Sequence, residues 1–288
     1  MRNWASLKMQ FISSTEEMHL LCLDLKKKPF NVGLVPTMGA LHDGHKSLIE
    51  QSLEDNEITL VSIFLNPAQF NSDTDLKTYP KTIEDDSELC DSLNVDFLFV
   101  PNAEQIYPSG YSTWVNVEGI SDKLCGLERP GHFKGVSTVV MKLLMICDPD
   151  FAYFGEKDFQ QFLIIQRMCS DLSLDTEIVL CPIIREKDGL ALSSRNVHLN
   201  REDRKLAGLI VKAMKEVELS FHKGERDCFK LTQKAEELLD VQNLNIEYID
   251  IVNPENLESL KEIEDIGRIM IAVKIGSVRL IDNLSLEL

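Results

Sequence analysis

A strand–turn–helix unit near the N-terminus constrains the fold of this 288-residue chain more than any other feature. The apolar run from Asn31 to Val35 predicts a buried parallel strand, and Pro36 and Gly39 are expected to end it in a tight turn. Helical spacing follows Gly44. In α/β proteins such a unit binds ligands, because the helix N-terminus presents unpaired backbone N–H groups and partial positive charge. The unit therefore predicts a parallel α/β fold with an anion site at this turn.

Two histidines give the turn a chemical character. His42 and His45 are three residues apart across Asp43 and Gly44, so at the start of a helix both can face one side. Their ring N–H groups would then donate to one phosphate. Gly44, which has no side chain, would leave space for the phosphate beside them. The alternative is that both are ordinary surface histidines in a turn, as isolated matches of this kind often are.

The first 182 residues continue the alternation of strands and helices. The predicted strands lie at 58–65, 95–101, 151–155 and 177–182, and the predicted helices at 14–28, 48–55, 82–93, 137–147 and 159–169. This order is typical of a parallel sheet covered by helices. Residues 113–117 alternate in polarity, which makes them a candidate edge strand and a candidate dimer contact.

Beyond about residue 182 the pattern changes. Residues 201–220 and 226–240 have amphipathic helical spacing, and residues 246–252, 268–275 and 278–282 have the composition of strands, with a hairpin predicted around Gly276. We therefore expect an α/β protein with two domains. A Rossmann-like, doubly wound parallel sheet would occupy residues 1–182, and a smaller α+β domain at 183–288 would act as a lid.

Polar side chains follow the predicted strands at their carboxyl ends, where open parallel sheets bind ligands. Asn66 and Gln69 can both donate and accept, which suits the hydroxyls and carboxylate of a small organic acid, although Asn-Pro also starts ordinary turns. Lys157 can reach a phosphate as a point charge, and Asp158 can accept from ribose hydroxyls. The alternative for that pair is an exposed surface contact of little energetic value.

Basic residues collect in a few segments of an acidic chain. The formal net charge is −17, which argues against a nucleic-acid partner, because such binding depends on neutralising phosphates. Yet cationic side chains recur in the segments after the strands: Lys134, Lys157, Arg185 and Arg195, with His42, His45 and His132. This pattern indicates one local site for a small anion. Glycines bracket His132 and Lys134 at a helix start, which suits a phosphate but is also typical of a plain glycine turn.

Other kinds of site are not indicated. The seven cysteines are scattered and include no C-x-x-C pair, so we expect neither a disulfide framework nor a zinc site. No apolar run approaches the roughly 20 residues that span a bilayer, and Met1–Trp4 lacks the apolar core of a signal peptide. We expect a cytoplasmic protein with no membrane partner.

Five segments, in order along the chain, resemble one enzyme family. The segments are 35–45 (VPTMGALHDGH), 62–70 (SIFLNPAQF), 129–136 (RPGHFKGV), 154–161 (FGEKDFQQ) and 185–196 (REKDGLALSSRN). Together they resemble the pantothenate synthetase (pantoate–β-alanine ligase) family, within the HxGH superfamily of nucleotidylyltransferases and class I synthetases. The last segment occupies the place of the mobile loop of class I synthetases, whose closure would expel water from the site.

The resemblance implies ATP-dependent amide formation. Pantoate would attack the α-phosphate of ATP to give pantoyl adenylate and diphosphate, and β-alanine would then displace AMP. The expected partners are these three small molecules, with Mg²⁺ bridging ATP phosphates rather than sitting in a protein cage, and a second copy of the chain in a homodimer. Two alternatives share the motifs: a nucleotidylyltransferase that stops at adenylyl transfer, and a non-catalytic ATP sensor.

The resemblance also assigns site residues. The catalytic residues would be His42, His45, Lys157 and Arg195. The predicted ATP-binding residues are Met38, Gly39, Ala40, Leu41, His42, Asp43, Gly44, His45, Gly155, Glu156, Lys157, Asp158, Ile184, Leu192, Ser193, Ser194 and Arg195, and the predicted substrate-binding residues are Asn66, Gln69, His132 and Gln161. No protein metal ligands are predicted. Whether Asp85 or Asp86 contacts Mg²⁺ stays open, because acidic residues in a first helical turn are explained by the helix dipole.

Overall fold

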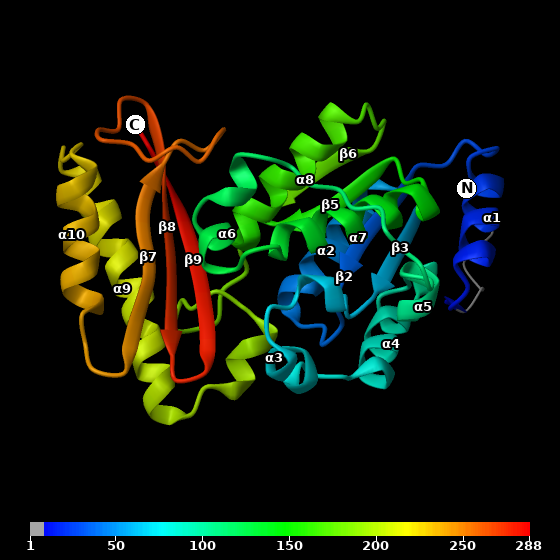
Figure 1. Ribbon diagram of the computed structural model, residues 1–288, viewed down its shortest axis with the longest axis horizontal. Helices are drawn as coiled ribbons and strands as arrows, with labels where there is room; N and C mark the ends of the chain where they lie inside the picture. Colours follow the sequence, from blue (N-terminus) through cyan, green and yellow to red (C-terminus); the bar gives the residue numbers. More distant parts are fainter. Residues whose placement is uncertain (1–8) are drawn as a thin grey trace.

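The computed structural model describes residues 9–288, so the expectation about a signal peptide at Met1–Trp4 concerns residues outside that range. A six-stranded parallel sheet has the order β1-β4-β3-β2-β5-β6, and a three-stranded antiparallel sheet has the order β7-β8-β9 (Figure 1). The strands of the parallel sheet are β1 (Gln10–Ile12), β2 (Val32–Thr37), β3 (Ile58–Ile63), β4 (Phe97–Phe99), β5 (Phe151–Gly155) and β6 (Glu177–Cys181).

Helices of varied length connect these strands. They are α1 (Thr15–Leu25), α2 (Asp43–Asp55), α3 (Asp73–Thr78), α4 (Ile83–Ser92), α5 (Ala103–Ile106), α6 (Cys125–Glu128), α7 (His132–Cys147) and α8 (Phe159–Asp171), with the single 3-10 turns η1 (Pro67–Gln69), η2 (Ile120–Asp122), η3 (Glu156–Asp158) and η4 (Ser194–His198). None of the helices among residues 9–288 combines the length and apolar character needed to cross a bilayer.

The central strands are buried on both faces, which explains their unbroken apolar composition. Successive residues of β2 face opposite sides: Leu34 belongs to the cluster formed with α1, α7 and α8, and Val35 to the cluster formed with α2 and α4. In β3, Leu60 and Val61 divide in the same way. Helices therefore cover both faces of the parallel sheet, and the expected doubly wound, Rossmann-like fold is confirmed.

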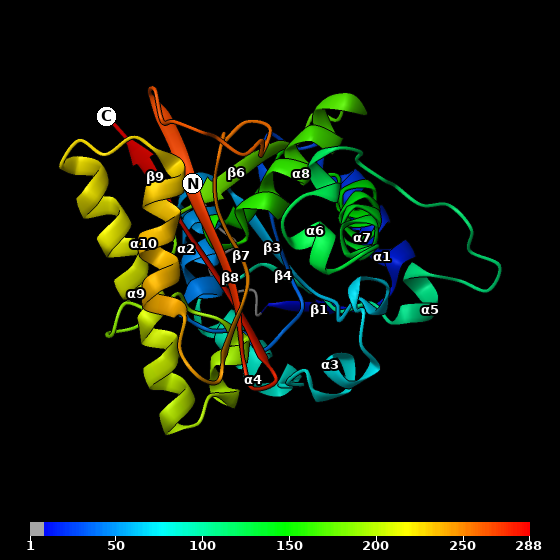
Figure 2. The same ribbon diagram turned by 60° about the vertical axis from the view of Figure 1, so that its left-hand side comes forward.

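The second sheet has a core of its own. It consists of β7 (Leu244–Val252), β8 (Ile266–Ile275) and β9 (Val278–Glu287), and its apolar side packs on α9 (Arg201–His222) and α10 (Cys228–Leu239). Figures 1 and 2 show both helices on the side of this sheet that faces away from the parallel sheet. The hairpin at Gly276, whose φ is +57°, is confirmed, and so is the small α+β unit. The boundary at 182/183 stays a prediction.

Three local expectations need correction. Residues 113–117 form no strand: the N–H of Val115 donates to Thr138 Oγ1 at 3.0 Å, and the ring of Trp114 stacks on Tyr107. The candidate dimer contact based on that strand therefore loses its basis. Pro36 does not end β2, which pairs with β3 as far as Thr37. The short edge strand β1 was not expected, because only one of its three residues is buried.

Candidate active site

A cavity of about 230 Å³ lies at the carboxyl ends of β2, β5 and β6, and it adjoins a cleft of about 720 Å³ between the two sheets. Lys157, Asp158 and Arg195 line both spaces. Most predicted site residues line the cavity: Met38, His42, Gly44, His45, Gln69, His132, Gly155, Lys157, Asp158, Gln161, Ile184, Leu192, Ser193, Ser194 and Arg195. Six others do not line it: Gly39, Ala40, Leu41, Asp43, Glu156 and Asn66.

The two histidines form the N-terminal cap of α2. His42 Nδ1 accepts the backbone N–H of Gly44 at 3.1 Å, and His45 Nδ1 accepts the N–H of His42 at 3.3 Å. The ring centroids are 4.1 Å apart. Desolvation lowers the pKa of His42 to about 4 and that of His45 to about 3, so both rings are neutral near pH 7. Since each Nδ1 accepts, each proton resides on Nε2, and both rings are N–H donors toward the cavity.

A buried carboxylate shapes the turn before these histidines. Gly39 and Ala40 have φ values of +83° and +51°, a backbone that turns back sharply. Asp86 Oδ2 accepts the N–H of Ala40 at 2.9 Å, and Asp86 Oδ1 accepts the N–H of Leu41 at 2.8 Å. Residues 39–41 therefore build the turn without lining the cavity. Asp86 does not line the cavity either, and Asp85 is exposed.

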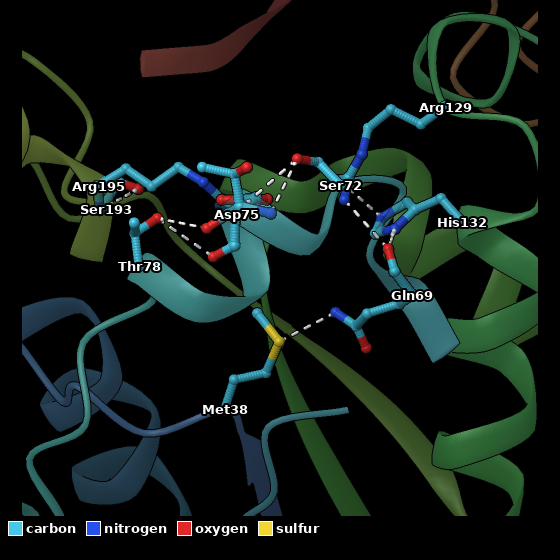
Figure 3. Close-up of polar contacts among 10 residues, drawn as sticks. Met38, Gln69, Ser72, Asp75, Thr78, Arg129, His132, Ser193 and Arg195 are labelled. Carbon is cyan, nitrogen blue, oxygen red and sulfur yellow. Dashed lines mark hydrogen bonds and ion pairs between the residues drawn. The ribbon is translucent and has the colours of Figure 1, made fainter. Parts of the chain in front are cut away.

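Gln69 reaches the cavity from η1, and its neighbours determine its orientation. Its Nε2 lies 3.0 Å from Met38 Sδ (Figure 3). Its Oε1 accepts from Asn66 Nδ2 at 2.9 Å. Asn66 is buried, donates to Gly135 O, and accepts from Tyr107 Oη and the N–H of Ala68. Because these contacts occupy its amide and it lies outside the cavity lining, Asn66 orients Gln69 from behind.

Helix α7 holds the backbone of Gln69 from the other side. His132 Nδ1 donates to Gln69 O at 2.7 Å, and Arg129 Nη1 donates to His132 Nε2 at 3.1 Å. Burial lowers the pKa of His132 to about 3, so this ring is also neutral. A Cβ on Gly135 would lie 2.4 Å from Ala68 O, so only glycine lets the helix approach η1 this closely. His132 is thus a positioning group as well as a lining group.

The charged wall of the cavity comes from η3 and η4. Lys157 Nζ lies 3.6 Å from Asp158 Oδ2, and Arg195 Nη2 donates to Asp75 Oδ2 at 3.1 Å. Although desolvation raises the pKa of Asp158, the charges of Lys157 and Arg195 bring it below its usual value. Ser194 Oγ donates to Ala40 O at 3.3 Å, which joins the η4 loop to the histidine turn. Donors from three separate segments therefore border one space.

Two expected cations lie elsewhere. Lys134 is exposed, with Nζ 5.4 Å from the centroid of the Trp114 ring, and Arg185 forms a bidentate pair with Asp282. Neither lines the cavity, so their expected part in the anion site is wrong.

Three other residues were missed: Arg129, Tyr79 and Asp75. Arg129 and Tyr79 line both spaces, and Asp75 lines the cleft. Arg129 begins the segment RPGHFKGV, which was a signal for it. Asp75 and Tyr79 lie in and just after the six-residue helix α3, outside the matched segments.

Comparisons with known proteins identify the family of this chain. The family model described as pantoate-beta-alanine ligase matches residues 10–285. The pantothenate synthetase of Thermodesulfovibrio yellowstonii is 47% identical over 281 residues, covering 97% of this chain and 100% of the relative. That of Acetivibrio thermocellus is 44% identical over 280 residues, covering 97% and 100%.

Solved structures give the same result. A crystal structure of pantothenate synthetase from Thermus thermophilus matches with a TM-score of 0.92 and 39% identity, covering 97% of this chain and 100% of that one. A pantoate-beta-alanine ligase from Francisella tularensis, crystallised with β-γ ATP and β-alanine, matches with a TM-score of 0.81 and 38% identity, covering 96% and 97%.

Proposed function

This chain belongs to the pantoate-beta-alanine ligase family, and we propose that its cavity and cleft together join pantoate to β-alanine at the expense of ATP. The observation that carries the proposal is the arrangement of donors. The Nε2–H groups of His42 and His45, the ammonium of Lys157 and the guanidinium of Arg195 border the same space as Gln69 and Gln161. Such a space suits a polyphosphate at one end and a small hydroxy acid at the other.

The first half-reaction would activate the acid. A carboxylate oxygen of pantoate attacks the α-phosphorus of ATP, the bond from that phosphorus to the bridging oxygen breaks, and diphosphate leaves. The product is pantoyl adenylate. Negative charge grows on the phosphate oxygens during the attack, and preorganised neutral and cationic donors stabilise it. We assign His42 and His45 to the α- and β-phosphates and Lys157 to the charge that develops between them.

The outer phosphates would meet the η4 loop. Ser193 and Ser194 offer hydroxyls, and Arg195 offers a planar fork that matches phosphate oxygens. The backbone around Met38, Gly155 and Ile184 would frame the nucleotide, as in the sequence-based expectation. Gln69 and Gln161 would hold pantoate through its hydroxyls and carboxylate.

The second half-reaction would form the amide. The neutral amine of β-alanine attacks the acyl carbon of the adenylate, the bond to the phosphate oxygen breaks, AMP leaves, and the nitrogen loses a proton. No covalent bond to the enzyme is required. Mixed anhydrides with AMP react readily because AMP is a far better leaving group than oxide.

The proposal also covers how Mg²⁺ binds, what the α+β unit does, and whether the protein is a cytoplasmic homodimer. Mg²⁺ would be bound through the ATP phosphates, as expected for a small hard cation that keeps several waters. The α+β unit borders the cleft through β9, which supports a lid role. A homodimer and a cytoplasmic location stay predictions from the sequence.

A coupled assay for AMP separates this function from its alternatives. We expect AMP only when pantoate, β-alanine and ATP are all present, and pantoate-dependent exchange of labelled diphosphate into ATP without β-alanine. A nucleotidylyltransferase would release diphosphate and never AMP, and a sensor would bind ATP and form neither product. Either outcome would contradict the ligase.

A further inference from the structure

Two adjacent residues of β9 hold two loops that border the ATP end of the site. Asp282 and Asn283 are 2% and 1% exposed, although both carry polar side chains. Burial on this scale requires hydrogen-bond partners. The partners of these two side chains lie in two different segments, one next to Lys157 and the other in the loop that leads to Arg195.

Asn283 holds the backbone at Lys157. Its Nδ2 donates to Glu156 O at 2.9 Å and to Lys157 O at 3.1 Å. Its Oδ1 accepts from Arg268 Nη1, and Arg268 Nη2 lies 2.8 Å from Glu156 Oε1. The Arg268 guanidinium also lies 3.9 Å from the centroid of the Phe159 ring. The carbonyl groups of Glu156 and Lys157 are thus bound to Asn283 of β9, and Arg268 of β8 holds the side chains of Asn283 and Glu156.

Asp282 holds the other loop. Its carboxylate accepts from Arg185 Nη1 at 2.6 Å and from Arg185 Nη2 at 3.0 Å, and Arg185 also donates to Gly189 O. The loop is a compact hairpin, because Leu192 N–H donates to Ile184 O. Asn196 Nδ2 donates to Glu186 Oε1 at 2.7 Å, which connects the middle of η4 to the same hairpin. The Asp282–Arg185 pair is therefore connected to Ser193–Arg195 through the hydrogen bonds of the hairpin and of Asn196.

We propose that Asp282 and Asn283 are positioning residues that hold the Lys157 loop and the 184–196 loop at one spacing across the cleft. This inference rests on the proposed function, since it concerns the phosphate end of that site. A displacement of about 1 Å in a catalytic group can cost a hundredfold in rate. The α+β unit thus sets the distance between the Lys157 ammonium and the Arg195 guanidinium, although neither Asp282 nor Asn283 touches the reacting atoms.

The test uses Asn283→Asp in the full chain. This substitution removes both N–H groups that bind Glu156 O and Lys157 O but keeps the acceptor for Arg268. We expect kcat for pantoate-dependent ATP–diphosphate exchange to fall on the order of tenfold, with little change in KM for pantoate. In a Lys157→Ala background the same substitution is expected to cause no further loss, because the group it positions is gone.

A purely structural role would give a different result. It would lower kcat by the same factor in both backgrounds, and that outcome would overturn the proposal. Arg226→Gln is the matched control, because Arg226 lies in the same unit and donates to Phe221 O at 2.6 Å without touching either loop. It is expected to leave kcat unchanged. If Asn283→Asp fails to fold, Arg268→Lys replaces it, with a smaller loss that also disappears without Lys157.

A chemical readout tests the proposal without turnover. Labelling of Lys157 by an amine-reactive ester, followed by mass spectrometry, reports how well the lysine is held. We expect faster labelling in Asn283→Asp than in wild type, and an unchanged rate would contradict the positioning role. If the wild-type protein showed no ligase activity but Lys157 were still labelled faster in Asn283→Asp than in wild type, only the proposed function would be contradicted.

Discussion

His45 Nδ1 accepts the backbone N–H of His42 at 3.3 Å, so the two histidines that line the cavity also form the N-terminal cap of α2. Helix caps are usually short oxygen-bearing side chains. Here an imidazole caps the helix with one nitrogen and keeps the other for a ligand. Local folding thus fixes the tautomer of both rings, with the proton on Nε2.

Replacing His45 with Ala is expected to lower the rate of adenylation on the order of a hundredfold or more, because one preorganised donor to the phosphates is lost. The measurement is pantoate-dependent ATP–diphosphate exchange. His222→Ala is the control, since His222 is exposed at the end of α9. An exchange rate equal to that of wild type would remove His45 from the mechanism.

Replacing Asp86 with Asn should destabilise the histidine turn. An amide can accept only through one oxygen, so the N–H of Ala40 or of Leu41 would lose its acceptor, at a cost of about 1–3 kcal/mol. Urea unfolding measures this loss, and KM for ATP should rise as the turn relaxes. Asp85→Asn is the matched control on the exposed side of α4, and we expect no change in stability or in the Mg²⁺ dependence of activity. Equal stability of the two variants would contradict this role of Asp86.

The adjacent glutamines of α8 should behave in opposite ways. Gln160 is buried and bonded to the N–H of Cys125 and to the carbonyls of Ile120 and Lys123. Gln161 lines the cavity, and its side chain has no hydrogen-bond partner within residues 9–288. Gln161→Ala should raise KM for pantoate about tenfold with an unchanged Tm, whereas Gln160→Ala should lower Tm. An equal rise of KM for pantoate in Gln160→Ala and Gln161→Ala would contradict a direct contact between Gln161 and pantoate.

Stability should depend on pH through the buried histidines. His42, His45 and His132 have folded-state pKa values of about 4, 3 and 3, below the value of 6.5 expected in the unfolded chain. Unfolding therefore takes up protons between pH 6.5 and about 4, and the free energy of unfolding falls as the pH falls through this window.

Urea unfolding between pH 5 and 8 checks this dependence. Near pH 8 these residues contribute almost no slope, because the unfolded-state histidines are also neutral there. Near pH 5 we expect uptake of about three protons from them, and about one fewer in His132→Gln. A flat stability curve between pH 5 and 6.5 would contradict the neutral, buried state of the three rings.

Much of the parallel sheet could be predicted, because its central strands are continuous apolar runs. Such a run predicts a buried strand without any knowledge of its tertiary contacts. The charged wall of the cavity could also be predicted, since Lys157 directly follows a predicted strand and Arg195 lies in one of the segments that resemble the family. The errors arose where tertiary contacts override local pattern. Residues 113–117 alternate like a strand, yet their backbone bonds to Thr138.

Electrostatic partners were the least predictable part of the site. Arg185 stands in a matched segment beside Ser193–Arg195, but its charge is taken by Asp282, almost a hundred residues later in the chain. Asp86 looked like one of several acidic residues on a solvated helix, although it is 3% exposed. Sequence spacing reports which residues share a helix face, and it carries no information on which distant carboxylate will meet them.

The close approach of Gly135 to Ala68 has a consequence for redesign of substrate choice. Any side chain at position 135 would push against η1 and move Gln69, although residue 135 itself does not line the cavity. Substitution of Gly135 can therefore change the shape of the cavity, and so the size of the acid it admits, from a position outside the cavity lining. Mutant libraries limited to the residues that line the cavity would not include this position.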